Sequence, residues 1–242
     1  MKKISWLAVA AISAVLLTAV SCASAPSSAS GASDNSAASA AVAGTVIPMA
    51  ASPLPIDGTD TGWPAAGVFP INDGDAGVTG KIHLAYDATA LYVYIDVSGV
   101  KPINFQTGKD IWNGNCLEVL LGLDPAESKY AAAIGPQDYQ IGISPGNARS
   151  HINPSSHDWT HGTGDPAQEI KVVPTAQGYQ MSAKLLWSHF KYTPVSGKTF
   201  MLDFALDTAS DPGLSRDGQW IMTGNADFYH TPSEWTTVAR LE

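Results

Sequence analysis

Apolar residues stand at every second position in five short segments of this 242-residue chain. Successive side chains of a β-strand point to opposite faces, so the alternation indicates strands with one face in a core and the other outside. Residues typical of turns bound the segments, for example Asp124-Pro125 and Ser144-Pro145-Gly146. The predicted strands occupy residues 91–97, 117–121, 139–143, 179–185 and 200–207.

Repeated short strands without long helical patterns predict an all-β fold. We therefore expect an antiparallel two-sheet β-sandwich of the jelly-roll or immunoglobulin-like type. The one segment with a helix-like pattern is a single turn over Leu186–Phe190. The chain has no internal repeat, and about 190 residues suit one domain.

The first 21 residues are organised like a signal peptide. Two lysines precede an apolar stretch, Trp6–Val20, which is shorter than a membrane span. Small residues then lead to Cys22, and this arrangement resembles a bacterial lipobox, in which cleavage frees the cysteine for lipidation. Ala19 stands where a lipobox usually has Leu. We expect residues 1–21 to be a lipoprotein signal peptide and Cys22 to be lipidated; the alternative is secretion with cleavage after Ala25.

Residues 22–48 are dominated by Ala, Ser and Gly and contain one charged residue, Asp34. Such a segment buries too little apolar surface to compensate for its ordering entropy, so it is predicted to be a flexible tether. The folded domain is expected to span residues 49–242. These assignments predict a lipid-anchored protein of the bacterial cell envelope, or a secreted one if Cys22 is not lipidated.

The charge balance excludes some partner classes. The chain has 13 basic and 22 acidic residues, for a net charge of −9. A nucleic-acid partner requires a basic stripe, and an anionic membrane surface attracts basic patches. The sequence therefore predicts no nucleic-acid partner, and membrane contact only through the N-terminal lipid.

The cysteines and most of the tryptophans are predicted to be structural. Two cysteines are too few for a disulfide scaffold, and Cys116 is expected to be a buried free thiol. Core packing best explains Trp63, Trp187 and Trp235. Trp159 stands in a Gly-, Ser- and Pro-containing loop, and an additional ligand platform there remains an alternative.

Several motifs occur in an order that resembles a family 9 carbohydrate-binding module over nearly all of residues 53–242. No single motif is specific, but together they are. The resemblance implies a β-sandwich that holds a sugar between two aromatic side chains, without catalysis. The motifs include IDGTDTGW at 56–63, GKIHLAYDATALYV at 80–93, WNGNCLEV at 112–119, DYQ at 138–140 and PSEW at 232–235.

The resemblance implies five sugar-binding residues. The family's two aromatic positions fall on Trp112 and Tyr229, and its glutamate falls on Glu118. Asn115 stands where the family has an aspartate, and Gln140 is the glutamine of the DYQ motif. A sugar's C–H face stacks on an aromatic ring while its hydroxyls need directional partners, so this mixture of residues suits an oligo- or polysaccharide.

Strand periodicity supports part of this site independently. Trp112 and Glu118 point to one face if the segment is a regular strand, opposite to Leu117, Val119 and Leu121. By the same rule, outward-facing polar residues would line a concave face. These residues are Gln140, Asp203 and Asp207.

The sequence also departs from the family pattern. Gly142 replaces a basic residue, Ala205 replaces a polar one, and Asp207-Thr208 replaces Asn-Asp. These departures leave open a structural or adhesion lipoprotein that kept the sandwich and lost the sugar site, or an accessory of a glycoside hydrolase system. A haem or electron-transfer module is a third hypothesis, since related sandwiches carry haem on a Met/His pair. The methionines available are Met181, Met201 and Met222, with no paired histidine suggested.

Metal binding and catalysis have weaker support. Aspartates in turns offer oxygen ligands for a structural calcium ion, although aspartates commonly form turns without one. His151, His157 and His161 share a loop without a helical pattern, so a solvated polar loop is favoured over a metal site. No G-x-S-x-G, H-E-x-x-H or P-loop motif is present, and no enzyme is predicted. The aspartates in question are Asp57, Asp60, Asp73, Asp75 and Asp87.

Overall fold

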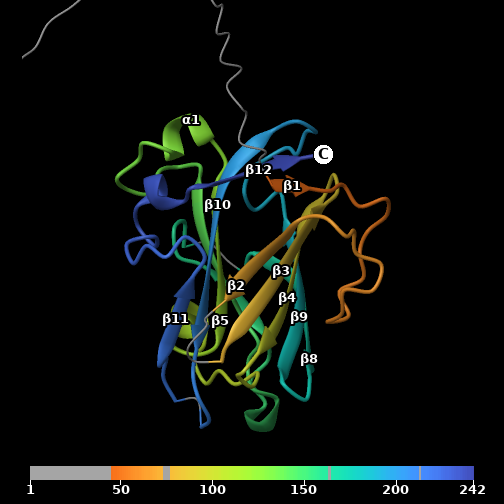
Figure 1. Cartoon of the computed structure of the whole chain (residues 1–242), viewed down its shortest axis with the longest axis vertical. Helices are drawn as coiled ribbons and strands as arrows, with labels where there is room; N and C mark the ends of the chain where they lie inside the picture. Colours follow the sequence, from red (N-terminus) through yellow and green to blue (C-terminus); the bar gives the residue numbers. More distant parts are fainter. Residues whose placement is uncertain (1–44, 73–76, 163–164, 213) are drawn as a thin grey trace, which may run out of the picture. The chain divides into compact units, whose positions relative to one another are not determined.

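The computed structural model describes residues 45–72, 77–162, 165–212 and 214–242, which form two sheets (Figure 1). The seven-stranded sheet has the order β1-β12-β10-β5-β6-β7, with β11 beside β10. Its strands are β1 (Thr45–Ile47), β5 (Cys116–Gly122), β6 (Asp138–Ser144), β7 (Ser155–Asp158), β10 (Thr199–Thr208), β11 (Gly218–Ile221) and β12 (Thr237–Leu241).

The second sheet has five strands in the order β2-β3-β4-β9-β8, and all its pairings are antiparallel. The all-β, two-sheet sandwich predicted from the alternation is confirmed, and each of the five predicted segments lies within a strand. The strands of this sheet are β2 (Val68–Asn72), β3 (Thr79–Tyr86), β4 (Ala90–Ser98), β8 (Ala167–Pro174) and β9 (Gly178–Leu186).

Helical structure is limited and differs from the prediction. Leu186 ends β9, residues 187–190 form hydrogen-bonded turns instead of a helix, and the chain leaves them through Lys191 with a positive φ of 49°. The described residues include no helix long and apolar enough to cross a membrane. The helical segments are α1 (Pro125–Ser128) and the 3-10 turns η1 (Gly108–Asn113), η2 (Ala148–Ser150) and η3 (Pro232–Glu234).

The predicted domain boundary at residue 48 is wrong. Thr45–Ile47 pair in parallel with β12, Ile47 is fully buried, and the Met49 N–H donates to the Glu242 carbonyl at 2.8 Å. This strand joins the two ends of the domain, a long-range pairing that local composition does not reveal. The predicted signal peptide, Cys22 and the rest of the predicted tether lie outside the described residues.

The main core fills the space between the sheets. Phe69 in β2 and Phe204 in β10 meet across it, with ring centroids 5.3 Å apart. Leu117, Val119 and Leu121 point inward from β5, as the alternation predicted. Their outward neighbours are also buried, since every residue of β5 is buried. A second layer must therefore cover this strand from outside.

Of the residues predicted to be structural, Trp187 and Trp235 are buried and Cys116 is a buried free thiol, as predicted. Trp63 is partly buried on the outer face of the five-stranded sheet, against Ala85, Ala90 and Tyr92.

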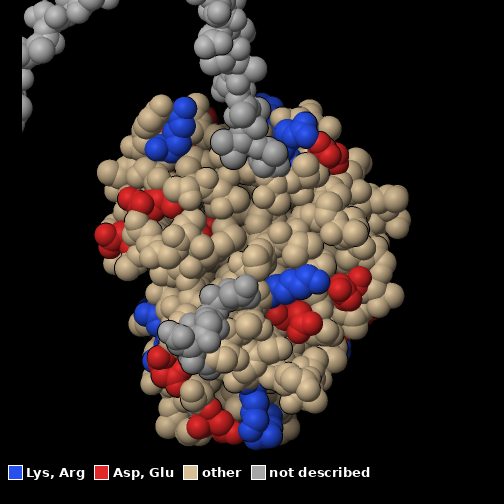
Figure 2. All heavy atoms as spheres, in the orientation of Figure 1, with Lys and Arg blue, Asp and Glu red and all other residues tan. Residues whose placement is uncertain are grey.

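On the face shown in Figure 2, basic side chains lie apart from one another and are interspersed with acidic ones.

His83, in β3, is a buried histidine. It is 6% exposed, packs edge-to-face on Tyr94 with centroids 5.4 Å apart, and has no hydrogen-bond partner for either ring nitrogen within the described part of the chain. Burial, and then the charge of Lys81, lower the pKa of His83 below its ordinary value of 6.5; Asp60 and Asp96 counter this only partly.

This lowered pKa predicts an acid-sensitive stability. Below pH 6.5 the unfolded chain binds a proton at His83 that the folded chain does not. The free energy of unfolding therefore decreases as the pH falls below 6.5, whereas above this pH His83 is neutral in both states and costs no stability. His83→Phe, which keeps a ring against Tyr94, is expected to flatten the decline between about pH 7.5 and about pH 5.5 in denaturant unfolding. His151→Asn, at an exposed histidine, is the control, and equal slopes in the native and His83→Phe proteins would contradict the prediction.

Candidate functional site

A cleft of about 740 Å³ opens on the outer face of the seven-stranded sheet. Its size lies in the range of small-molecule sites. Glu118 and Gln140 form part of its floor because they alternate with inward-facing core residues on β5 and β6. The lining residues are Lys109, Asp110, Trp112, Glu118, Gln140, Trp159, Arg216, Gln219, Ala226 and Tyr229.

The cleft borders an apolar cluster that covers the neighbouring part of the same sheet face. Phe228 and Trp235 pack there against Leu120, Met201 and Ala205, and the Trp235 Nε1–H donates to the Phe228 carbonyl at 2.7 Å. Phe228 is fully buried, whereas the next residue, Tyr229, is 52% exposed. The anchored Phe228 therefore delivers Tyr229 to the cleft.

Trp112 reaches the cleft from η1 and not from a strand. The condition of a regular strand through Trp112 and Glu118 is not met, because the 3-10 turn Gly108–Asn113 precedes β5. Ile111 is buried beneath the turn and leaves Trp112 39% exposed. The guanidinium carbon of Arg216 lies 4.8 Å from the Trp112 ring centroid, a cation–π contact.

Polar side chains on the floor form a buried network. The Gln140 Nε2 donates to Glu118 Oε2 at 2.6 Å. The Gln219 Nε2 and Arg216 Nη1 donate to Asp207 Oδ1 at 2.9 and 2.8 Å. Glu118 is 2% exposed and Asp207 is fully buried, so both carboxyl groups depend on protein partners instead of water.

Burial shifts the titration of this floor. Burial, and then the negative charge of Glu118, raise the pKa of Asp207 to about 9, and Arg216 counteracts only part of the shift. Asp207 therefore keeps its proton at neutral pH. Its Oδ2 has no hydrogen-bond partner among the residues that the structure describes. The floor thus carries less negative charge than its carboxyl groups suggest.

Asn115 is not a cleft residue, and its predicted sugar contact is wrong. It is fully buried, and its Nδ2 donates to the carbonyls of Lys101, Ile103 and Ala209. Its Oδ1 accepts from the Ala209 N–H at 3.1 Å. The side chain therefore ties loops to the start of β5. Asn115 shares the parity of Leu117, and that periodicity already indicated the inner side.

Four of the five predicted sugar-binding residues line the cleft: Trp112, Tyr229, Glu118 and Gln140. Asp207 joins the floor network, whereas Asp203 accepts hydrogen bonds from Thr223 outside the lining. Periodicity could not find the residues that loops and short turns bring to the cleft. These are Lys109, Asp110, Arg216 and Ala226, and also Trp159, which the loop composition had offered only as an alternative platform.

Two of the departures from the family pattern, Gly142 and Ala205, occupy packed positions. A Cβ atom on Gly142 would lie 2.3 Å from Cη2 of Trp159, so the indole fills the space of a side chain there. Ala205 is fully buried in the apolar cluster beneath Phe228. Neither position leaves a gap in the cleft. Packing thus explains these two departures, and the cleft is retained.

Metal ligands do not gather among the described residues, where no three His, Cys, Asp or Glu side chains form a group fit for an ion. Asp57 and Asp87 accept hydrogen bonds within their own turns, from Thr59 and Thr89. Asp73 and Asp75 lie outside the described residues. Structural calcium remains a prediction.

The remaining candidates are the histidines of residues 151–161 and the methionines considered as haem ligands. His161 is not simply solvated, since it packs on Tyr139 with centroids 4.3 Å apart and lies 3.6 Å from Asp158. Met181 lies in the main core, while Met201 lies in the apolar cluster of the outer face. These positions give the haem hypothesis no support.

A family model described as "Carbohydrate family 9 binding domain-like" matches residues 56–241. The chain belongs to this family. The family 9 resemblance read from the motifs is confirmed, and the match covers all the residues that line the cleft. No curated protein matches the chain.

Solved family 9 structures share the fold. A family 9 module from Caldicellulosiruptor kristjanssonii in complex with cellotriose is 18% identical, with a TM-score of 0.60 over 81% of this chain and 93% of that one. The same organism's module with glucose is 18% identical, with a TM-score of 0.58 over 81% and 95%. A carbohydrate-binding protein from Bacteroides uniformis, itself assigned by inference, is 11% identical, with a TM-score of 0.50 over 83% and 100%.

The coupling of Asp207 to Glu118 can be measured directly. In the native protein, carboxyl-carbon NMR is expected to show Asp207 titrating near pH 9. Glu118→Gln should lower this pKa, because the variant removes a neighbouring negative charge. Exposed Asp211, whose pKa Lys101 lowers, should not change. Titration of native Asp207 near its ordinary 3.8 would contradict the prediction.

Proposed function

We propose that the cleft binds a neutral oligosaccharide, with sugar rings stacked on Trp112 and Tyr229. The observation that carries the proposal is the combination of two partly exposed aromatic rings and a buried polar floor in one cleft. A pyranose presents C–H groups on its faces and hydroxyls around its edge. Aromatic faces suit the former, and the carboxylate and amide of Glu118 and Gln140 suit the latter.

The balance of charges in the cleft favours a neutral sugar. Lys109 pairs with Asp110 at 2.8 Å at the rim, and Arg216 is engaged with Asp207 and Trp112. The lining contains two basic residues, Lys109 and Arg216, and two acidic ones, Asp110 and Glu118, so it offers no excess of positive charge to an acidic sugar. The C. kristjanssonii modules contain cellotriose and glucose, which makes cello-oligosaccharides the first ligands to test, with xylo-oligosaccharides beside them.

The same geometry supports a proposal of binding without catalysis. A glycosidase uses one carboxyl group as an acid and a second as a nucleophile or base against one glycosidic bond. Here Glu118 accepts from Gln140, and Asp207 is fully buried beneath Gln219 and Arg216. We assign both groups to the floor of a binding site and place no chemical step in the cleft.

We also propose that a lipid on Cys22 attaches the protein to the bacterial envelope. The lipobox-like sequence before Cys22 supports this attachment. The domain would then hold a glycan near the cell surface, alone or as an accessory of a glycoside hydrolase system. A structural lipoprotein without a sugar site is disfavoured, since the packing at Gly142 and Ala205 keeps the cleft formed.

Loss of either aromatic platform should weaken sugar binding. Trp112→Ala and Tyr229→Ala are each expected to cost about 1–3 kcal/mol, roughly 5- to 150-fold in Kd, by isothermal titration with cello- and xylo-oligosaccharides. Tyr130→Ala is the matched control, because Tyr130 is 78% exposed and lies outside the cleft.

The titrations should be repeated with added calcium and with a chelator. Absence of binding across a glycan array in both conditions would reject the function. An equal loss of affinity in Tyr130→Ala would reject the assignment of the two platforms.

A further inference from the structure

Packing and a hydrogen bond fix the position of the Trp159 indole in the cleft. Its indole lies over Gly142, where any side chain would collide with it, and its Nε1–H donates to the Lys109 carbonyl at 2.7 Å. Gly142 pairs directly with Glu118 across β5 and β6. The indole therefore lies beside the Glu118–Gln140 pair, where a sugar stacked on it can reach hydrogen-bond acceptors.

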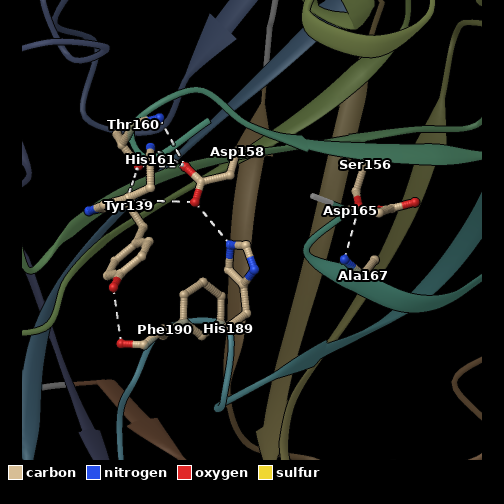
Figure 3. Close-up of polar contacts among 9 residues, drawn as sticks. All are labelled: Tyr139, Ser156, Asp158, Thr160, His161, Asp165, Ala167, His189 and Phe190. Atoms are coloured by element: carbon tan, nitrogen blue, oxygen red, sulfur yellow. Dashed lines mark hydrogen bonds and ion pairs between the residues drawn. The ribbon is translucent and has the colours of Figure 1, made fainter. Parts of the chain in front are cut away.

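The backbone on both sides of Trp159 is held in place (Figure 3). Buried Asp158 accepts from the Thr160 N–H at 2.9 Å and from the His161 N–H at 3.1 Å, and it pairs with His189 Nε2 at 2.9 Å. Burial alone would raise the pKa of Asp158, but these hydrogen bonds outweigh it and lower the pKa to about 2. The Asp158 carboxylate is therefore charged at neutral pH.

Two further contacts complete this support. The Trp159 N–H donates to the Gln140 carbonyl at 3.1 Å, which extends the β6–β7 pairing by one residue. His161 packs on Tyr139, whose hydroxyl donates to the Phe190 carbonyl at 3.0 Å (Figure 3). A loop residue with this many fixed neighbours is pre-ordered, so a ligand that stacks on it loses little affinity to ordering entropy.

The two indoles of the cleft, Trp112 and Trp159, differ in what packs against them. Arg216 lies over Trp112. Within the described residues, the other cation over an aromatic ring is Lys129 on Tyr130, whereas Trp159 packs with the ring of His157 at an interplanar angle of 66°, centroids 5.6 Å apart. The cleft volume of about 740 Å³ also exceeds the needs of a single pyranose of about twelve non-hydrogen atoms.

We propose that Trp159 is a third stacking platform, so that the cleft prefers a chain of linked sugar residues to a single sugar. The inference rests on the proposed function and adds a second subsite to it. One sugar residue engages Trp112 and Tyr229, and the next stacks on Trp159 beside Glu118.

The test is the dependence of affinity on chain length. With the native protein, Kd for cello- or xylo-oligosaccharides is expected to improve at least about 10-fold from one to three residues. Trp159→Ala should remove this gain, weakening trisaccharide binding about 10-fold while changing monosaccharide binding by less than about 3-fold. Trp63→Ala, an indole loss on the other sheet, should preserve the gain.

Two further variants protect the test against misfolding of Trp159→Ala. Trp159→Phe keeps a flat ring and should retain trisaccharide affinity within about 3-fold. Gly142→Ala leaves Trp159 in the sequence but displaces its ring, and it should reproduce the loss. Circular dichroism and the melting temperature verify that each variant is folded.

The outcomes separate the two levels of the proposal. If the native protein binds no sugar, the proposed function fails. If it binds sugars and Trp112→Ala weakens binding, but Trp159→Ala and Gly142→Ala leave the trisaccharide affinity unchanged, the third platform is overturned and the function stands. The same holds if native affinity does not increase with chain length.

Discussion

The pairing of β5 with β10 at the centre of the seven-stranded sheet is the constraint on which the rest of the structure depends. All of β5 and all of β10 except Thr199 are buried, so both strands are covered on their outer as well as their inner face. The inner face is apolar and packs on the second sheet. The outer face carries Glu118 and Asp207, and buried carboxyl groups require partners or a retained proton.

Two different covers meet these requirements. Over part of the face, the segment with Phe228 and Trp235 forms an apolar lid on Leu120, Met201 and Ala205. Over the remainder, side chains with amide and guanidinium groups bind the carboxyl groups of Glu118 and Asp207 and leave a cleft above them. The binding site is thus the part of a buried polar surface that the fold does not close with apolar residues.

Local support for the cleft comes from loops that are anchored at buried points. Ile111 anchors η1 beneath Trp112, Phe228 anchors the segment that carries Tyr229, and Asp158 fixes the backbone around Trp159. In each case a buried residue stands next to an aromatic residue that lines the cleft. This spacing fixes the position of each ring through core packing, while the ring itself remains available to a ligand.

The sequence by itself determined the sandwich, its central strands and four residues of the cleft, because alternation and motif order are local properties that survive without knowledge of contacts. Only the tertiary structure decided the rest. It placed Asn115 inside, paired β1 with β12, and filled the space at Gly142 with Trp159. These outcomes depend on contacts between segments far apart in the chain, and a residue pattern carries no information about which distant side chain fills a given space.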